Sequence, residues 1–185
     1  MALAVLTKRS VASLLAVAFA SAPLSAQERY LDARVDGDGV LRIVTARGEI
    51  IAPGPQPDRE FDRKQVGYDR IQISPGGEAV GWLAMFPNCC TSYPIPLELV
   101  VYADGIKRAY TGVGLPIFRW RFLGTGDRVA FRQETVHGGF GVHYELRNVK
   151  TGELLAEYQP RVGPDNRILP DQSAPDWVAT LDAGP

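Results

Sequence analysis

Two adjacent cysteines are the first residues of this sequence whose types and spacing could do chemistry. Cys89 and Cys90 are the only cysteines of the chain, and in an oxidising compartment neighbouring thiols can close a strained, easily reduced disulfide. Thiol oxidoreductases instead use Cys-x-x-Cys at the start of a helix. We therefore interpret the segment as a loop that the cysteine pair stiffens, with a ligand-facing or redox-sensitive turn as the functional alternative. Its candidate ligand-binding residues are Asn88, Cys89, Cys90, Thr91, Ser92 and Tyr93.

Both histidines of the chain lie in a second, glycine-rich segment between residues 133 and 145. His137 and His143, together with Glu134, would offer nitrogen and oxygen ligands to zinc. Their spacing matches no established metal motif, so a tight hairpin with solvated or hydrogen-bonded histidines is the competing interpretation. We predict no resident metal and no cofactor, and keep these three residues as the metal-ligating candidates. The candidate ligand-binding residues of this segment are His137, Gly138, Gly139 and His143.

No arrangement of side chains in the sequence identifies a reaction. Ser92 or Thr91 as nucleophile with His137 as base would suit hydrolysis, yet the chain has no Gly-x-Ser-x-Gly elbow. The 21 acidic residues give no means of choosing an acid partner for such a pair. We therefore predict no catalytic residue, and favour a non-catalytic role while leaving enzyme activity open.

The first 26 residues have the layout of an export signal. Lys8 and Arg9 form a basic segment, Val11 to Ala22 is apolar, and Ser25-Ala26 is a small-residue exit. The apolar stretch is too short to span a bilayer, and no later segment is long and apolar enough to do so. We therefore predict a periplasmic or secreted bacterial protein with no membrane span once the signal is cleaved.

Composition limits what the exported chain can be. Loss of Lys8 and Arg9 with the signal leaves 18 basic residues against 21 acidic ones, a net charge of −3. A nucleic-acid binder would carry a basic excess, so we exclude nucleic acid as a partner and expect an unknown protein or small ligand. The 19 Gly and 14 Pro favour short strands and turns over long helices.

An internal repeat organises the rest of the chain. Positions in the first copy recur in the second at a constant offset of 49 residues. Each copy has the pattern of strand, glycine turn, strand, longer loop, strand, glycine turn and strand, which predicts one four-stranded antiparallel sheet. The units cover residues 69–112 and 117–159, so the cysteine and histidine segments fall in equivalent loops, at one rim of neighbouring sheets. Ile71, Ile73, Gly77, Val80 and Trp82 correspond to Trp120, Phe122, Gly126, Val129 and Phe131.

We expect one all-β domain over residues 27–160. An N-terminal hairpin, with strands at Tyr30–Val35 and Val40–Thr45 and a third at 49–52, precedes the two units. The alternating run from Phe118 to Phe122 is predicted to place its aromatic side chains on one face of a core strand and its arginines on the other. The proline-rich tail, residues 161–185, is predicted to hold a short helix with Ser173 as its N-cap.

The repeat units resemble the blades of TolB-like and WD-type β-propellers. The segments Ile73-Ser-Pro-Gly-Gly-Glu-Ala-Val-Gly-Trp82 and Asn148-Val-Lys-Thr-Gly-Glu-Leu-Leu155 are similar to the family's Ser-Pro-Asp-Gly turn, its Val-Ala-Phe strand and its Thr-Gly turn. Gly76 stands where the family has Asp. Because closure takes about four to eight blades, two units imply an open or partial propeller, two packed sheets, or part of a ring that partners complete.

The sequence therefore predicts an exported, non-catalytic binding or scaffolding domain whose ligand is not specified. The resemblance implies an interaction platform, and the binding surface would be the loops Asn88–Pro96 and His137–His143. The alternative is a metal-binding or hydrolytic protein that uses the His137/His143 loop.

Overall fold

The computed structural model describes residues 28–57, 64–88, 92–137, 141–163, 167–169, 171 and 173–183. In these residues the chain forms eleven strands and one short helix. The strands make three antiparallel sheets of three, four and four strands that do not close into a barrel, so the predicted all-β class is confirmed. Within the same residues no helix has the length and apolar character to cross a membrane. The predicted export signal lies outside the described residues and stays a prediction.

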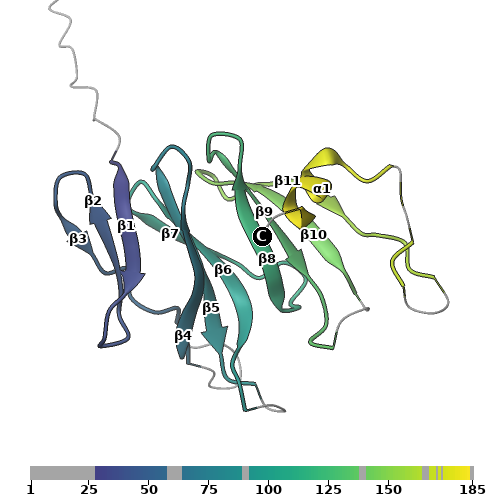
Figure 1. The fold of residues 1–185 in the computed structure, drawn as a ribbon, viewed down its shortest axis with the longest axis horizontal. Helices are drawn as coiled ribbons and strands as arrows, with labels where there is room; N and C mark the ends of the chain where they lie inside the picture. The colour runs from purple at the N-terminus through teal and green to yellow at the C-terminus, as the bar shows by residue number, and fades with distance from the viewer. Residues whose placement is uncertain are drawn as a thin grey trace, which may run out of the picture.

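Each sheet is a meander in which neighbouring strands follow one another along the chain (Figure 1). The second and third sheets correspond to the two predicted repeats, and the first sheet to the predicted hairpin with its third strand. The first sheet holds β1 (Tyr30–Val35), β2 (Leu41–Thr45) and β3 (Ile50–Ile51). The second holds β4 (Gly67–Ile73), β5 (Ala79–Phe86), β6 (Ile95–Ala103) and β7 (Ile106–Tyr110). The third holds β8 (Ile117–Leu123), β9 (Arg128–Gln133), β10 (His143–Asn148) and β11 (Leu154–Tyr158).

Equivalent glycine turns join the first two strands of each repeat. Gly77, between β4 and β5, has a φ of 72°, and Gly126, between β8 and β9, has a φ of 102°. Residues with a side chain avoid this region, which is why glycine occupies the same place in both copies. A Cβ atom on Gly126 would lie 2.6 Å from the Cβ of Ser74 in the neighbouring turn, so the two turns need glycine to pack together.

The three sheets stack face to face, and the middle sheet is covered on both sides (Figure 1). Leu83 and Leu99 on one face share a buried cluster with Trp120 of the third sheet. Trp82 on the opposite face shares a cluster with Ile43 of the first sheet. Because both faces are buried, β5 and β6 are almost continuously apolar and do not alternate between apolar and polar residues.

The seams between the sheets are held closely at one end of the stack. The Tyr30 amide donates to the Gly77 carbonyl at 2.7 Å, which joins the first sheet to the second. The Gly76 amide donates to the Thr125 carbonyl at 3.3 Å, which joins the second sheet to the third. We call this the glycine-turn end, because the Gly77 turn and its counterpart meet there.

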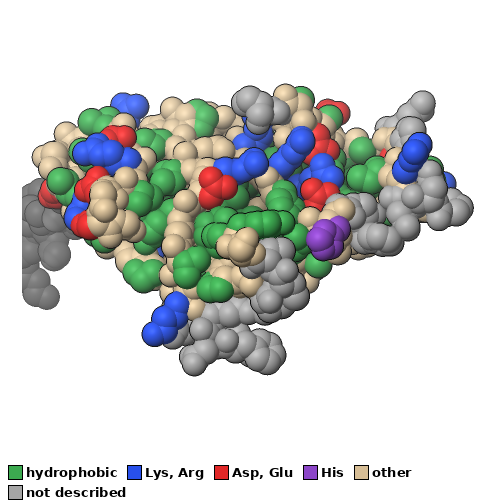
Figure 2. All heavy atoms as spheres, turned by 60° about the horizontal axis from the view of Figure 1, so that its bottom comes forward, with side chains coloured by type: hydrophobic (Ala, Val, Ile, Leu, Met, Phe, Trp, Pro, Cys, Tyr) green, Lys and Arg blue, Asp and Glu red, His purple; other side chains and the backbone are tan. Residues whose placement is uncertain are grey.

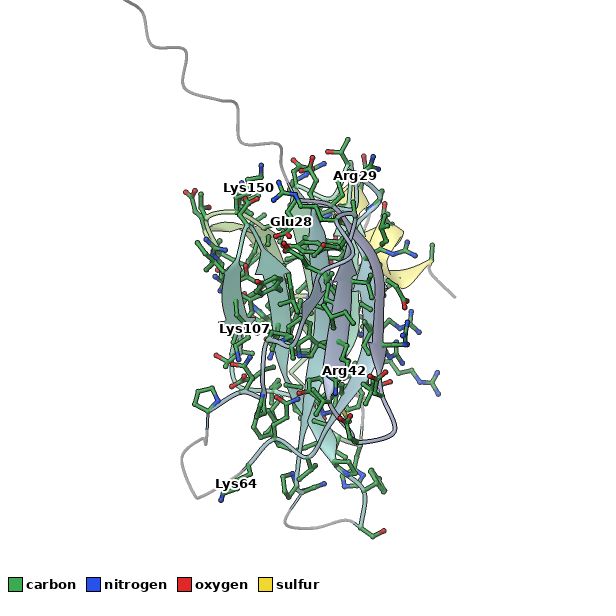
Figure 3. All side chains as sticks on the ribbon, turned by 90° about the vertical axis from the view of Figure 1, so that its left-hand side faces the viewer. Glu28, Arg29, Arg42, Lys64, Lys107 and Lys150 are labelled. Atoms are coloured by element: carbon green, nitrogen blue, oxygen red, sulfur yellow. The ribbon has the colours of Figure 1, made fainter. Side chains whose placement is uncertain are left out.

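The opposite end, which we call the loop end, carries the longer connections between strands. Figure 3 separates the two ends, with Glu28, Arg29 and Lys150 at the glycine-turn end and Lys64 at the loop end. Because the chain meanders, all long connections of the repeats fall on the same side. The strands that they join are β5 to β6, β7 to β8 and β9 to β10, and the connection from β3 of the first sheet to β4 begins and ends at the same end.

The helix α1 (Asp176–Asp182) covers the outer face of the third sheet, as Figure 1 shows. Val178 and Leu181 are buried there, and Trp177 packs against the same cluster. A short helix in the tail is therefore present, but the predicted N-cap is wrong. The Ser173 hydroxyl donates to Asp171, and the helix begins after an extended Pro175 with no side-chain cap, which leaves the serine outside the capping position.

Two arginines of β8 hold the carboxyl end of the helix. Arg119 donates to the main-chain carbonyl of Asp182 at 2.9 Å, and Arg121 donates to that of Thr180 at 2.6 Å. Positive groups stabilise the negative end of a helix dipole. These arginines lie on the face of β8 opposite the buried Trp120, as the alternation of the sequence predicts.

Candidate functional site

A pocket of about 270 Å³ lies in the seam between the second and third sheets, at the loop end. Four strands and both long loops of the repeats contribute to its lining. Leu83 and Ile117 belong to the core cluster that fills the seam, and Met85 packs against that cluster. The pocket is therefore the part of the seam that the core does not fill. Its lining residues are Asp69, Arg70, Leu83, Met85, Tyr93, Pro94, Ile95, Pro96, Ile117, Phe118 and Val136.

The two loops that the sequence pairs meet at this pocket. The cysteine segment contributes Tyr93 with the two prolines that follow it, and the histidine segment contributes Val136. Figure 2 shows hydrophobic side chains gathered on this end of the molecule, with acidic and basic side chains beside them. Tyr93 lines the pocket and is 57% exposed, so it lies at the edge where the pocket meets solvent.

A bulge in β4 places a charged pair at the pocket. The register of β4 shifts between Asp69 and Gln72, and within this bulge Arg70 has a φ of 49°, which residues with a side chain rarely adopt. One oxygen of the Asp69 carboxylate accepts a hydrogen bond from the Arg70 amide at 2.8 Å. The other lies 3.8 Å from Arg70 Nε, and both side chains are about half exposed. The pocket therefore has an apolar interior and one charged edge.

Phe118 lines the pocket, although the alternation of its strand assigns it to the core. A bulge between Ile117 and Arg119 interrupts β8, and it shifts Phe118 out of alternation with Trp120. Ile117 is fully buried, whereas Phe118 is only partly buried. The expectation that the three aromatic residues of this run share one buried face is therefore wrong for Phe118.

His143 lies in a strand and not in the loop where the sequence analysis places it. It is the first residue of β10, and its side chain is buried. Its Nε2 lies 3.4 Å from Glu145 Oε1, while Glu145 Oε2 accepts a hydrogen bond from Arg147 Nε at 2.6 Å. Glu145 therefore sits between the buried His143 and the partly buried Arg147 along one face of β10.

The three metal-ligating candidates have different surroundings in the structure. The Glu134 carboxylate accepts a hydrogen bond from Arg132 at 2.8 Å, and His137 is exposed beside the pocket residue Val136. Among the residues that the structure describes, no group of three His, Cys, Asp or Glu side chains is placed to hold a metal ion. Neither His137 nor His143 lines the pocket.

Several candidate residues lie outside the described part of the chain. Of the cysteine segment, Asn88 is partly buried and Ser92 is exposed. The disulfide between adjacent cysteines stays a prediction. The candidates outside the described residues are Cys89, Cys90, Thr91, Gly138 and Gly139.

A second pocket, of about 250 Å³, lies at the same end in the seam between the first and second sheets. The connection after β3 forms one wall and is held by Lys107, whose ammonium group donates to the carbonyls of Pro53, Gly54 and Pro55 at 2.9–3.3 Å. Burial lowers the pKa of Lys107. This pocket has one aromatic lining residue, Tyr68, three glycines and no charged side chain. Its lining residues are Gly39, Val40, Gly54, Pro55, Gln65, Val66, Gly67 and Tyr68.

The lining residues that the sequence analysis missed come from strands and not from loops. Asp69 and Arg70 carried one usable signal, because two successive charged residues interrupt the apolar/polar alternation of a half-buried strand. Leu83, Met85 and Ile117 carried none, since a core residue and a pocket residue have the same apolar character.

Comparison with known proteins adds no relative from which a function could be transferred. No family model matches the chain, and no curated protein or solved structure matches it significantly.

Proposed function

We propose that this protein is an exported, non-catalytic binding module whose ligand occupies the pocket between the second and third sheets. One observation carries the proposal: Tyr93 and Val136, from the two loops that the repeat makes equivalent, line the same apolar pocket. Ligand sites are typically concave and mostly apolar, with few polar groups. The polar groups here are Asp69, Arg70 and Tyr93, which suit recognition by hydrogen bonds and charge.

The architecture supports a role as an interaction platform. In this proposal the stack is an open, partial propeller of the kind that TolB-like and WD-type repeats build, with its long loops gathered at one end. Three of the exposed apolar residues lie in or next to these loops, at Val66, Tyr93 and Val113. Apolar side chains gathered on one end of a protein mark a surface for binding. Export to the periplasm or beyond remains part of the proposal through the N-terminal signal.

Methyl NMR can test the pocket, because the chain has only two methionines, Met1 and Met85. Met85 lines the pocket, so protein with a ¹³C-labelled methionine methyl group gives one reporter in the site. 2-Naphthylmethanol is a suitable neutral probe. Met1 belongs to the proposed N-terminal signal that export removes, so the exported chain has Met85 as its one methionine, and we expect a saturable shift of its signal.

A pair of valine variants makes the test specific. Val136→Trp adds an indole at the pocket wall and should abolish the Met85 shift. Val113→Trp is the matched control, because Val113 is 54% exposed in a neighbouring loop and does not line the pocket. An unmoved Met85 signal in the unmodified protein, or a shift that survives in Val136→Trp, would overturn the proposed function.

A further inference from the structure

We propose that the pocket selects a small carboxylate with a flat apolar body, which lies in the seam while the carboxylate pairs with Arg70. This inference rests on the proposed function and names the ligand class for the same site. It draws on the size and walls of the pocket, and on the hydrogen-bonding state and backbone of Arg70.

The size and walls of the pocket fit a flat apolar group. A cavity of about 150 Å³ holds benzene, so about 270 Å³ admits a body nearly twice as large, such as a fused bicyclic ring. Phe118 and Tyr93 supply aromatic walls and Pro94 a flat aliphatic one. The thioether of Met85 adapts to the shape of what it contacts and interacts well with aromatic rings.

Arg70 is the group at the charged edge that can take a further partner. Among the described residues its guanidinium has no hydrogen-bond partner, and its Nε is 3.8 Å from the Asp69 carboxylate, beyond hydrogen-bonding distance. Asp69, in contrast, already accepts the Arg70 amide. A guanidinium offers a planar fork of N–H donors that matches a carboxylate.

The backbone conformation of Arg70 favours glycine, so the presence of arginine there needs an explanation. A left-handed φ of 49° is strained for any residue with a side chain, whereas glycine adopts it freely. Strained residues of this kind cluster at ligand sites. Protection of the β4 edge by charge is the competing explanation, and it predicts no effect of Arg70 on ligand binding.

Asp69 restricts the charge of the ligand to a single negative unit. A dianionic phosphate would face one arginine and one aspartate, and repulsion from the Asp69 carboxylate would offset much of the attraction. A cation would have to displace the Arg70 guanidinium from its place near Asp69. A monocarboxylate satisfies the free fork without either penalty.

Calorimetric titration of the full chain with three matched probes tests the inference. These probes are 2-naphthoate, 2-naphthylmethanol and 2-naphthylmethylamine, which share the ring and differ in charge. We expect 2-naphthoate to bind about tenfold more tightly than the alcohol, as a hydrogen bond to a charged group implies, and the amine to bind no more tightly than the alcohol. Arg70→Gly should remove the preference for 2-naphthoate while the alcohol still binds.

A second glycine variant controls for backbone strain. Apart from Arg70, Asp104 is the one described non-glycine residue with a positive φ, which is 50°. It lies in the β6–β7 turn and does not line the pocket. Asp104→Gly should keep the preference for 2-naphthoate, and neither glycine variant should lower the melting temperature, because relief of strain offsets the added flexibility of the unfolded chain.

The outcomes separate the two proposals. Equal affinity for the acid and the alcohol, or a preference that persists in Arg70→Gly, would overturn the ligand class and leave the binding module intact. No binding of any probe, together with an unmoved Met85 signal, would overturn the proposed function and this inference with it.

Discussion

Replacement of Gly81 by alanine should weaken the whole stack, because this glycine sets the spacing between the second and third sheets. A Cβ atom at this position would lie 2.5 Å from Trp120 Cη2 and 2.8 Å from Trp120 Cζ3. Real Cβ atoms do not approach other atoms so closely. The indole has little room to retreat, because it is buried and packs edge-on against Phe122 with ring centroids 5.3 Å apart.

The size of the effect follows from the cost of overpacking a core. Added atoms in a packed interior cost about 1–3 kcal/mol, and the immobile indole puts Gly81→Ala in the upper half of that range, at about 2–3 kcal/mol. For a chain of this length each 1 kcal/mol lowers the melting temperature by about 2–4 °C, so we expect a decrease of roughly 4–12 °C. Urea denaturation and calorimetry measure the two quantities.

A matched glycine and a second-site change make this prediction refutable. Gly67→Ala is the control, because a Cβ there would meet nothing closer than Met85 Cβ, at an ordinary 3.7 Å. In a Trp120→Leu background, Gly81→Ala should cost less than in the unmodified protein, as expected for two residues in contact. A melting temperature for Gly81→Ala equal to that of Gly67→Ala would refute the reasoning.

Three other predictions concern single side chains. Gln133→Ala should lower the free energy of unfolding by about 2–4 kcal/mol, because the buried amide accepts from the Val113 N–H and donates to two carbonyls of the same connection; urea denaturation measures this, and unchanged hydrogen exchange at Val113 would argue against it. Burial raises the pKa of Tyr30 from 10.0 to about 12, so the unfolded chain loses the phenol proton at a lower pH than the folded chain does. The contribution of Tyr30 to the free energy of unfolding should therefore be constant below pH 10 and fall between pH 10 and about 12. Denaturation midpoints at several pH values should fall less steeply in Tyr30→Phe, and equal slopes would contradict the assignment. Zinc added to chelator-treated protein should leave the melting temperature unchanged, and a rise that His143→Ala abolishes would restore the metal-binding alternative.

The sheets could be predicted from the sequence because their pattern is local. Gly77 and Gly126 fix equivalent turns through their backbone conformation, and each turn sets the register of the strands beside it. The continuous apolar run of β5 gave no face preference, because burial of both faces depends on the sheets that cover it. The N-cap of the helix was missed because of a local competitor: the Ser173 hydroxyl binds the Asp171 carboxylate and does not cap α1.

The candidate site could be predicted only in part, because a pocket is a property of packing. The repeat offset placed the two long loops at one end, and Tyr93 and Val136 do line one pocket there. The bulges that bring Arg70 and Phe118 to the same pocket depend on how β4 and β8 pair with their neighbouring strands. The alternation of residues along a single strand carries no information on that pairing. His143 was assigned to the loop because the glycines before it indicate a turn. In the structure β10 begins at His143 itself, and the side chain of this residue is buried.

The two outer faces of the stack bear on the proposal that ligands bind at the loop end. On the first sheet, Arg34 and Arg42 lie directly opposite each other and pair with acidic side chains of the adjoining turn, including Asp36 and Asp38. A further sheet packed there would desolvate these charges at a cost that their pairing does not recover. The outer face of the third sheet is already covered by α1. The paired charges of the first sheet and the helix on the third therefore oppose growth of the stack where they lie, although Leu31 and Ile50 of the first sheet are exposed. At the loop end the apolar seam is left open by the strands that build it.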